Sequence, residues 1–264
     1  MPSEPTIWLA RPRGFCAGVC RALATIEAVL ANRSRPIYVN HEIVHNDHVA
    51  DDLRSRGVAF ANTLADVPDG ATLIISAHGV AADFMAAARN RGLQVIDATC
   101  PLVEKVHHKA RRAVAAGKTV ILIGHRGHPE VVGTLGQVAP DAAFLVESPA
   151  DVAVLPNLDS KRITVLTQTT LTPEDIAAVT DALVRRFPGI QLGDDLCYAT
   201  RNRQQAVRDL AGHCPLILVV GSPRSSNSRR LVEVAQTAGV KAFLVQDAGE
   251  LREEWLEGAK AIGI

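Results

Sequence analysis

The sequence of 264 residues has few aromatic side chains and no surplus of either charge. Phe, Trp and Tyr make up 4% of it, so a folded core must rest mainly on Ala, Val, Leu and Ile. Lys and Arg number 28, as do Asp and Glu. Because nucleic-acid binding needs an excess of cations to neutralise phosphates, we expect no nucleic-acid partner.

Long apolar runs are also lacking. No stretch approaches the roughly 20 residues that a membrane-spanning helix needs, and the first residues lack the charged start and apolar core of a signal peptide. We therefore expect a soluble, cytoplasmic protein with no membrane partner. The five cysteines do not fit a disulfide framework, which leaves metal binding, catalysis or burial as their roles.

What the sequence does contain is an alternation of short apolar segments with Ala-rich and Arg-rich amphipathic segments. This alternation predicts parallel strands joined by helices, an α/β fold. The expected strands are 7–10, 36–39, 72–76, 95–98, 119–123, 163–167, 215–220 and 242–245, and helices include 21–32, 104–116 and 203–211.

One unit of cysteine, helix, strand and polar loop occurs three times. A count of 24 residues leads from Cys16 to the end of PIYVN, from Cys100 to the end of TVILIG, and from Cys197 to the end of LILVVG. Diverged copies of one unit imply three small α/β domains, related by a pseudo-threefold axis, with mainly parallel sheets around a central cluster site.

The copies define the expected domain boundaries. The first α/β domain covers residues 1–99, the second 100–194 and the third 195–264. Because the third copy ends where the other two continue into a polar loop, we expect the third domain to be truncated at its C-terminus.

Each repeat cysteine follows a strand and precedes a helix. A helix N-terminus favours thiolate over thiol, and ligands in α/β folds bind at the carboxyl ends of strands. Convergence of Cys16, Cys100 and Cys197 would suit zinc or an iron–sulfur cluster, each with one open position, and the spacing does not separate the two. Burial is the usual fate of a free cysteine, and it is the role we expect for Cys20 and Cys214, which lie outside the repeat.

Polar residues gather in the loops that follow the strands. Imidazole, hydroxyl and amide donors beside Gly-rich turns suit a diphosphate, and no Walker or dinucleotide fingerprint is present. The predicted anion is therefore a small substrate. The candidate residues are His45, His78, His128, Thr169, Ser225, Ser226 and Asn227.

Glu130 lies in the loop GHRGHPE, which faces the expected metal site. A carboxylate there can relay protons, or it can stabilise the first turn of a helix through the helix dipole. The residues alone leave both roles open.

Eight motifs together resemble the 4-hydroxy-3-methylbut-2-enyl diphosphate reductase family, of the LytB type, over residues 7–264. They are PRGFCAGV, HEIVHN, SAHGV, DATCPLV, GHRGHPEVVGT, TQTTL, CYATRNRQ and VVGSPRSSNS. The resemblance implies one [4Fe–4S] cluster per chain with an open iron, held by Cys16, Cys100 and Cys197. It also implies reductive dehydroxylation of the allylic diphosphate to isopentenyl and dimethylallyl diphosphate, the last step of the non-mevalonate pathway.

The resemblance further implies roles for the polar loops. Glu130 matches the acid that relays protons, assisted by His128, and Thr169 lies beside the substrate alcohol. The residues that match the diphosphate pocket are His45, His78, His128, Ser225, Ser226 and Asn227. Ferredoxin or flavodoxin is the expected electron donor, because the sequence has no flavin or nicotinamide motif.

Three other functions fit parts of the pattern: a three-thiolate zinc hydrolase, a non-catalytic iron–sulfur sensor, and a hydro-lyase with a three-cysteine cluster. Zinc without iron or sulfide favours the hydrolase. A sensor does not bind a small diphosphate, and a hydro-lyase turns over substrate without an electron donor.

Overall fold

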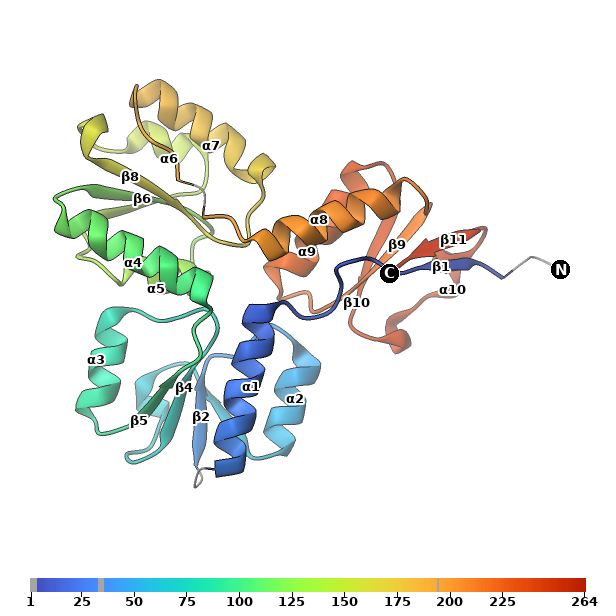
Figure 1. Cartoon of the computed structure of the whole chain (residues 1–264), viewed down its shortest axis with the longest axis horizontal. Helices are drawn as coiled ribbons and strands as arrows, with labels where there is room; N and C mark the ends of the chain where they lie inside the picture. The colour runs from blue at the N-terminus through green and yellow to red at the C-terminus, as the bar shows by residue number, and fades with distance from the viewer. Residues whose placement is uncertain (1–3, 33–35, 194) are drawn as a thin grey trace. The chain divides into compact units, whose positions relative to one another are not determined.

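The computed structural model describes residues 4–32, 36–193 and 195–264 (Figure 1). Strands alternate with helices along the chain and form three separate sheets. All strand pairs within the described residues are parallel, which confirms the predicted α/β class with parallel sheets. In the parts of the chain that the structure describes, every helix is too short or too polar to cross a lipid bilayer.

The chain divides into two compact units. The first unit comprises the described residues up to Phe15, together with His45–Val49 and Tyr198–Ile264. The second unit comprises Cys16–Val44 and Ala50–Cys197. Each unit is therefore built from segments that are separated in the sequence.

The division into three domains, 1–99, 100–194 and 195–264, stays a prediction. Residue 194, at the second of these boundaries, lies outside the described residues.

One sheet of the second unit has the strand order β3-β2-β4-β5. Its elements are α1 (Ala17–Asn32), β2 (Ile37–Asn40), α2 (Asp47–Ser55), β3 (Val58–Ala61), a 3-10 turn (Leu64–Asp66), β4 (Thr72–Ile75), α3 (Ala82–Asn90) and β5 (Gln94–Asp97). The first residues of α2, up to Val49, belong to the first unit. Leu73 and Ile75 alternate along β4 and pack in one cluster with Ala88 of α3. The alternate residue Ile74 is also fully buried, so both faces of the sheet are covered.

The other sheet of the second unit has the order β7-β6-β8. Its elements are α4 (Pro101–Ala115), β6 (Thr119–Ile123), α5 (Pro129–Leu135), β7 (Ala143–Val146), α6 (Pro149–Val154), a 3-10 turn (Ser160–Arg162), β8 (Ile163–Thr167) and α7 (Pro173–Arg186). The expected strands 119–123 and 163–167 are confirmed with these bounds.

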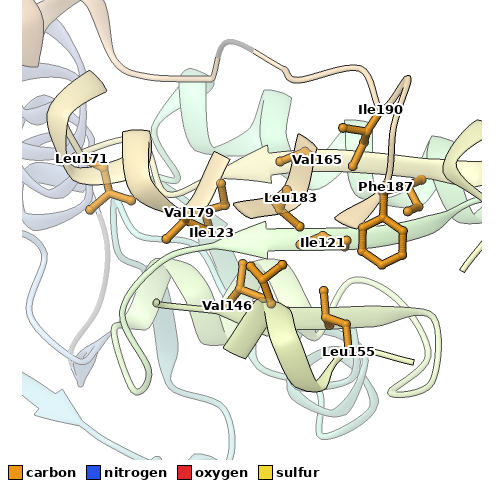
Figure 2. Close-up of a cluster of buried hydrophobic side chains, with 12 residues drawn as sticks. Ile121, Ile123, Val146, Leu155, Val165, Leu171, Val179, Leu183, Phe187 and Ile190 are labelled. Carbon is orange, nitrogen blue, oxygen red and sulfur yellow. The ribbon is translucent and has the colours of Figure 1, made fainter. Parts of the chain in front are cut away.

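Alternation along β6 supplies two cores. Ile121 and Ile123 join Leu183 of α7 in the cluster that Figure 2 shows, where the labelled side chains of β6 and α7 point toward one another. Val120 and Leu122 point to the opposite face and belong to the cluster that includes residues of α4 and α5. The sheet therefore lies between two helical layers, and its polar strand ends emerge at one edge.

The sheet of the first unit has the order β1-β11-β9-β10. Its elements are β1 (Thr6–Trp8), α8 (Tyr198–Ala211), β9 (Leu216–Val220), α9 (Ser226–Thr237), β10 (Lys241–Val245), a 3-10 turn (Ala248–Glu250), α10 (Glu253–Leu256) and β11 (Ala261–Gly263). Ile7 and Trp8 are 51% and 42% exposed. The prediction of a buried strand at 7–10 is wrong in this respect, because β1 is a three-residue edge strand.

The same strand order recurs in all three sheets. In each, the first strand that follows the repeat cysteine in sequence lies between the other two of its copy, as β3-β2-β4, β7-β6-β8 and β10-β9-β11. A fourth strand extends two of them: β5 pairs with β4, and β1 pairs with β11. This shared order is what copies of one unit are expected to show.

Shortening a buried side chain of α7 tests whether this helix packs in the centre of its cluster. Leu183→Ala removes a side chain that is fully buried, so it should lower the free energy of unfolding by about 2–5 kcal/mol. Val184→Ala on the same helix is the matched control, since Val184 is 44% exposed and its loss should cost less than about 0.5 kcal/mol. Urea unfolding followed by circular dichroism measures both, and equal effects would contradict this packing.

Candidate active site

The three repeat cysteines lie in the second unit, each directly before a helix. Cys100 is the N-cap residue of α4, with Pro101 in the first helical position. Cys16 precedes α1, and its Sγ accepts a hydrogen bond from the backbone N–H of Val19 at 3.5 Å. Cys197 precedes α8. Free N–H groups at helix starts stabilise negative charge, so each cysteine lies beside backbone donors suited to an anionic ligand.

Two of these thiols, those of Cys16 and Cys100, lie close to Gly18. A Cβ placed on Gly18 would lie 2.7 Å from Sγ of Cys100 and 3.8 Å from Sγ of Cys16. The first contact is shorter than real Cβ atoms make, so only glycine leaves the sulfur in place. The absence of a side chain at position 18 therefore keeps the space beside the sulfurs open.

Burial raises the pKa of the Cys100 thiol. The backbone N–H groups of Leu102 and Val103 oppose this shift, and the nearby thiols of Cys16 and Cys197 add to it. The Cys100 thiol thus senses the other two, as expected of a shared ligand set before a cation is bound.

No group of three or more His, Cys, Asp and Glu side chains within the described ranges is arranged to hold a single metal ion.

Glu130 is buried, with 3% of its surface exposed, in the first turn of α5. Its Oε1 accepts the backbone N–H of Thr169 at 2.6 Å, and its Oε2 accepts the Thr169 hydroxyl at 3.0 Å. Burial raises the pKa of Glu130 to about 7, although the two hydrogen bonds from Thr169 favour the charged form. A carboxyl with a pKa near neutrality can both release and take up a proton.

Thr169 connects this acid to one of the thiols. Its backbone carbonyl accepts the N–H of Cys197 at 2.8 Å, while its N–H and hydroxyl both bind Glu130. The loop after β8 therefore fixes the acid and the cysteine through one residue.

Gln168 holds the neighbouring loop in place. Its side-chain oxygen accepts the backbone N–H of His125 at 3.0 Å, and its side-chain nitrogen donates to the hydroxyl of Thr170 at 2.8 Å. Gln168 is 1% exposed, so these bonds are shielded from water. The amide thereby ties the GHRGHPE loop to the TQTTL loop.

Two of the predicted histidines lie side by side in the second unit. The rings of His78 and His128 are 6.0 Å apart between centroids and nearly perpendicular, at 83°. Nδ1 of His128 accepts the backbone N–H of Glu130 at 3.2 Å, so His128 caps α5. Nδ1 of His78 lies 3.3 Å from the hydroxyl of Ser76. Imidazole groups thus flank the start of the helix that carries the buried acid.

The other predicted anion ligands lie in the first unit, which contains both His45 and the start of α9. Ser225 is the N-cap of this 12-residue helix, and its hydroxyl accepts the N–H of Ser228 at 3.2 Å. Ser226 and Asn227 are its first residues. The N–H groups of a helix start bind anions, so this end of α9 is suited to a phosphate group.

Asn227 gives a further sign of a polar ligand at this helix start. Its side-chain oxygen is buried and has no hydrogen-bond partner in the described residues. A buried polar atom without a partner is costly, and ligands or waters commonly satisfy such atoms.

The two cysteines outside the repeat lie in contrasting places. Cys214 is 2% exposed and packs in the core formed by α8, α9 and β9, so the expected core role is confirmed. Cys20 is exposed on α1, so the expectation that it packs in a core is wrong.

A scan against protein-family models matches residues 7–264 to the model described as LytB protein. The chain belongs to the LytB family. A relative from Dechloromonas aromatica (strain RCB) is 53% identical over 260 residues, covering 98% of this chain and 85% of the relative. A relative from Escherichia coli O1:K1 / APEC is 53% identical over 262 residues, covering 98% and 83%. Both are named 4-hydroxy-3-methylbut-2-enyl diphosphate reductase.

Solved structures of LytB-type reductases have the same fold. The E-1-hydroxy-2-methyl-but-2-enyl-4-diphosphate reductase from Plasmodium falciparum superposes with a TM-score of 0.93 at 40% identity, covering 99% of this chain and 82% of that one. A second structure is described as (E)-4-hydroxy-3-methyl-but-2-enyl diphosphate reductase, the terminal enzyme of the non-mevalonate pathway. It gives a TM-score of 0.71 at 31% identity, covering 99% and 92%. The family and fold class expected from the motifs are confirmed.

Sequence reasoning missed two residues that shape this LytB site, Gly18 and Gln168. Both lie inside motifs that were recognised, GFCAGV and TQTTL. A glycine two positions after a ligand cysteine is a signal for close approach, and a glutamine between threonines at a strand end is a signal for loop bridging. Neither signal predicts which atoms Gly18 and Gln168 contact in the folded protein.

The burial of Glu130 predicts how stability depends on pH. Its pKa is raised from 4.5 to about 7 in the folded protein, so its contribution to stability is fully present below about pH 4.5 and is lost as pH rises through about 7. Glu130→Gln keeps acceptor and donor groups for Thr169 but does not titrate. Between pH 5 and 8 the free energy of unfolding should fall more in the parent protein than in this variant, by an amount on the order of 3 kcal/mol.

Urea unfolding at several pH values measures this difference. Glu253→Gln, which removes an exposed glutamate of α10, is the control and should preserve the parent pH dependence. Parallel pH curves for the parent and Glu130→Gln would contradict the raised pKa.

Proposed function

We propose that this chain is a 4-hydroxy-3-methylbut-2-enyl diphosphate reductase, which converts that allylic diphosphate to isopentenyl and dimethylallyl diphosphate. Membership in the LytB family and the names of its relatives confirm the enzyme class expected from the sequence. The observation that carries the proposal for this chain is the buried carboxyl of Glu130, joined through Thr169 to the ligand candidate Cys197.

The proposed cofactor is one [4Fe–4S] cluster held by Cys16, Cys100 and Cys197. Three thiolates suit iron–sulfur ligation, and each binds a different iron, so they need not converge on one point. The Cys100 thiol lies near the thiols of Cys16 and Cys197, which supports a shared ligand set, and membership in the LytB family favours the cluster over one zinc ion. The open space at Gly18 fits the same interpretation. When bound, such a cluster supplies two electrons one at a time and an open iron that polarises the substrate's C–O bond.

Glu130 is the proposed proton donor. The reaction takes up two electrons and two protons and releases water, so an acid must supply protons in a site that excludes bulk water. Glu130 is buried and has a pKa of about 7, so a large share of its carboxyl groups carries a proton at neutral pH. Thr169 holds both carboxyl oxygens and is the proposed neighbour of the substrate alcohol, while His128 at the start of α5 assists the proton relay.

Binding of the diphosphate is proposed for the imidazoles and for the start of α9. His78 and His128 lie together in one unit, and His45 lies in the other unit with the α9 residues. The α9 residues that we propose to bind the diphosphate are Ser225, Ser226 and Asn227. Fixing the diphosphate would orient the far end of the substrate for reduction without a bimolecular search.

The electron donor and the cellular location are proposed from two features of the sequence, its cofactor motifs and its cysteines. The sequence has no nicotinamide or flavin fingerprint, which supports ferredoxin or flavodoxin as the proposed donor. All five cysteines are free thiols, as is usual in the reducing cytoplasm, and this supports the proposed cytoplasmic location.

Replacing the ligand cysteines tests the cofactor. Cys16→Ser, Cys100→Ser and Cys197→Ser should each lose most of the iron and sulfide retained after anaerobic reconstitution, because a hydroxyl is a poor ligand for iron in a cluster. The exposed Cys20→Ser and the core variant Cys214→Ala are controls that should keep the parent content. Metal and sulfide analysis with a visible spectrum measures both sets. Stoichiometric zinc in the parent protein would favour the hydrolase instead.

Replacing Glu130 tests the acid. Glu130→Gln should keep the cluster and bind substrate normally, yet lower kcat by about 10²- to 10⁴-fold, because an amide cannot donate the proton. Parent turnover should also decline as pH rises above about 7, as the carboxyl loses its proton. Steady-state assays with a reduced donor measure both. Full activity of the variant would overturn the proton-donor role.

Omitting the electron donor separates the remaining functions. A reductase should consume no substrate without a reduced donor, whereas a hydro-lyase or a hydrolase would still turn it over. Failure to bind any small diphosphate would favour an iron–sulfur sensor.

A further inference from the structure

Asp47 joins two loops of the first unit that are far apart in sequence. Its Oδ2 accepts a hydrogen bond from the hydroxyl of Ser222 at 3.0 Å, and its Oδ1 pairs with the guanidinium of Arg224. Asp47 lies two residues after His45, and Arg224 lies directly before Ser225. The contact therefore connects the two loops of this unit that carry proposed diphosphate ligands.

The position of Asp47 is set by a helix start. The side-chain oxygen of Asn46 accepts the N–H of Val49 at 3.0 Å, which caps α2 at its first residue, Asp47. An aspartate at this place is favoured by the helix dipole, so its carboxylate is held in a defined direction.

The partner loop is equally well defined. The carbonyl of Ser222 accepts the N–H of Ser225 at 3.0 Å, and the hydroxyl of Ser222 accepts the N–H of Arg224 at 3.2 Å. Ser222 is 2% exposed, so these bonds are shielded from water. Because the turn ends at Ser225, any change at Ser222 or Arg224 is passed to the N-cap of α9.

The end of β9 leaves this turn little freedom. A Cβ at Gly221 would lie 2.3 Å from the hydroxyl oxygen of Ser228 in α9. The strand end and the first turn of α9 are thus in close contact, and the orientation of the helix start depends on the short loop between them.

We propose that Asp47 is a positioning residue for diphosphate binding, which acts through Ser222 and Arg224 on the N-terminus of α9. The proposal rests on the proposed function, because it takes the start of α9 as an anion site. Asp47 carries a negative charge and would by itself repel a diphosphate. Its pairing with Arg224 offsets that charge, and its bond to Ser222 orders the loop.

A positioning role for Asp47 and a purely electrostatic role predict opposite changes in diphosphate affinity when Asp47 is replaced. If only charge mattered, Asp47→Ala would leave a free cation beside the anion site and tighten binding. As a positioning residue, Asp47 should instead weaken binding on replacement, by on the order of tenfold in Kd, through loss of hydrogen bonds to a charged group. Arg224→Ala should weaken binding further, since it leaves a bare carboxylate there.

The experiment measures binding of inorganic diphosphate by calorimetry, with the full chain purified and reconstituted anaerobically. The variants are Asp47→Ala, Arg224→Ala and the double variant, with Asp47→Asn as a milder change that keeps an acceptor for Ser222. Asp51→Ala is the matched control, because Asp51 lies one turn along α2 and pairs with Arg54. Its Kd should equal that of the parent protein.

The expected pattern is a weaker Kd for Asp47→Ala that persists in high salt, and a double variant that binds better than Arg224→Ala. In turnover assays KM should rise about as much as Kd while kcat stays near the parent value, as for loss of uniform binding. A general structural defect would lower kcat and cluster content as well.

Two negative results have different meanings. Equal Kd values for the parent and a folded Asp47→Ala, or tighter binding by that variant, would overturn the role of Asp47 alone. Absence of diphosphate binding by the parent protein would overturn the proposed function and this role with it. Ser225→Ala, which alters the proposed ligand directly, shows that the assay reports on the start of α9.

Discussion

The three hydrogen bonds of Thr169 are the interaction on which the candidate site depends. The backbone N–H and the hydroxyl hold the two oxygens of Glu130, and the carbonyl accepts the N–H of Cys197. The loop after β8 thus binds both the start of α5 and Cys197 through one residue. Burial of Glu130 against this residue gives the carboxyl a pKa near neutrality, so the packing that builds the site also sets its acidity.

Much of the architecture could be predicted because its signals are local. Apolar runs such as 119–123 and 163–167 are recognisable as strands from composition alone, and they are observed with those bounds. The cysteine spacing identified the repeat, and the shared strand order agrees with it. The strands β3, β7 and β11 were not among those predicted, because short strands with mixed residues have no distinctive period.

What could not be predicted depends on contacts between distant segments. The sequence gives no sign that Thr6–Trp8 adds to the sheet formed by β9, β10 and β11, because edge pairing is set by the fold. For the same reason the sequence left two roles open for Glu130, a carboxylate that stabilises the first turn of a helix and an acid that relays protons. Residues alone do not state burial, and burial is what shifts the pKa. The bond between Asp47 and Ser222 spans 175 positions and has no sequence pattern.

The pairing of β1 with β11 has a consequence for how the protein is made. The strand at Thr6–Trp8 is synthesised long before its partner at Ala261–Gly263, because most of the described chain lies between them. The second unit, which ends at Cys197, can acquire its cores while synthesis continues. The sheet of the first unit must wait, with the strand at Thr6–Trp8 unpaired, until Ala261–Gly263 has been translated. Assembly of the enzyme is therefore ordered, and its late step is the long-range closure of one sheet.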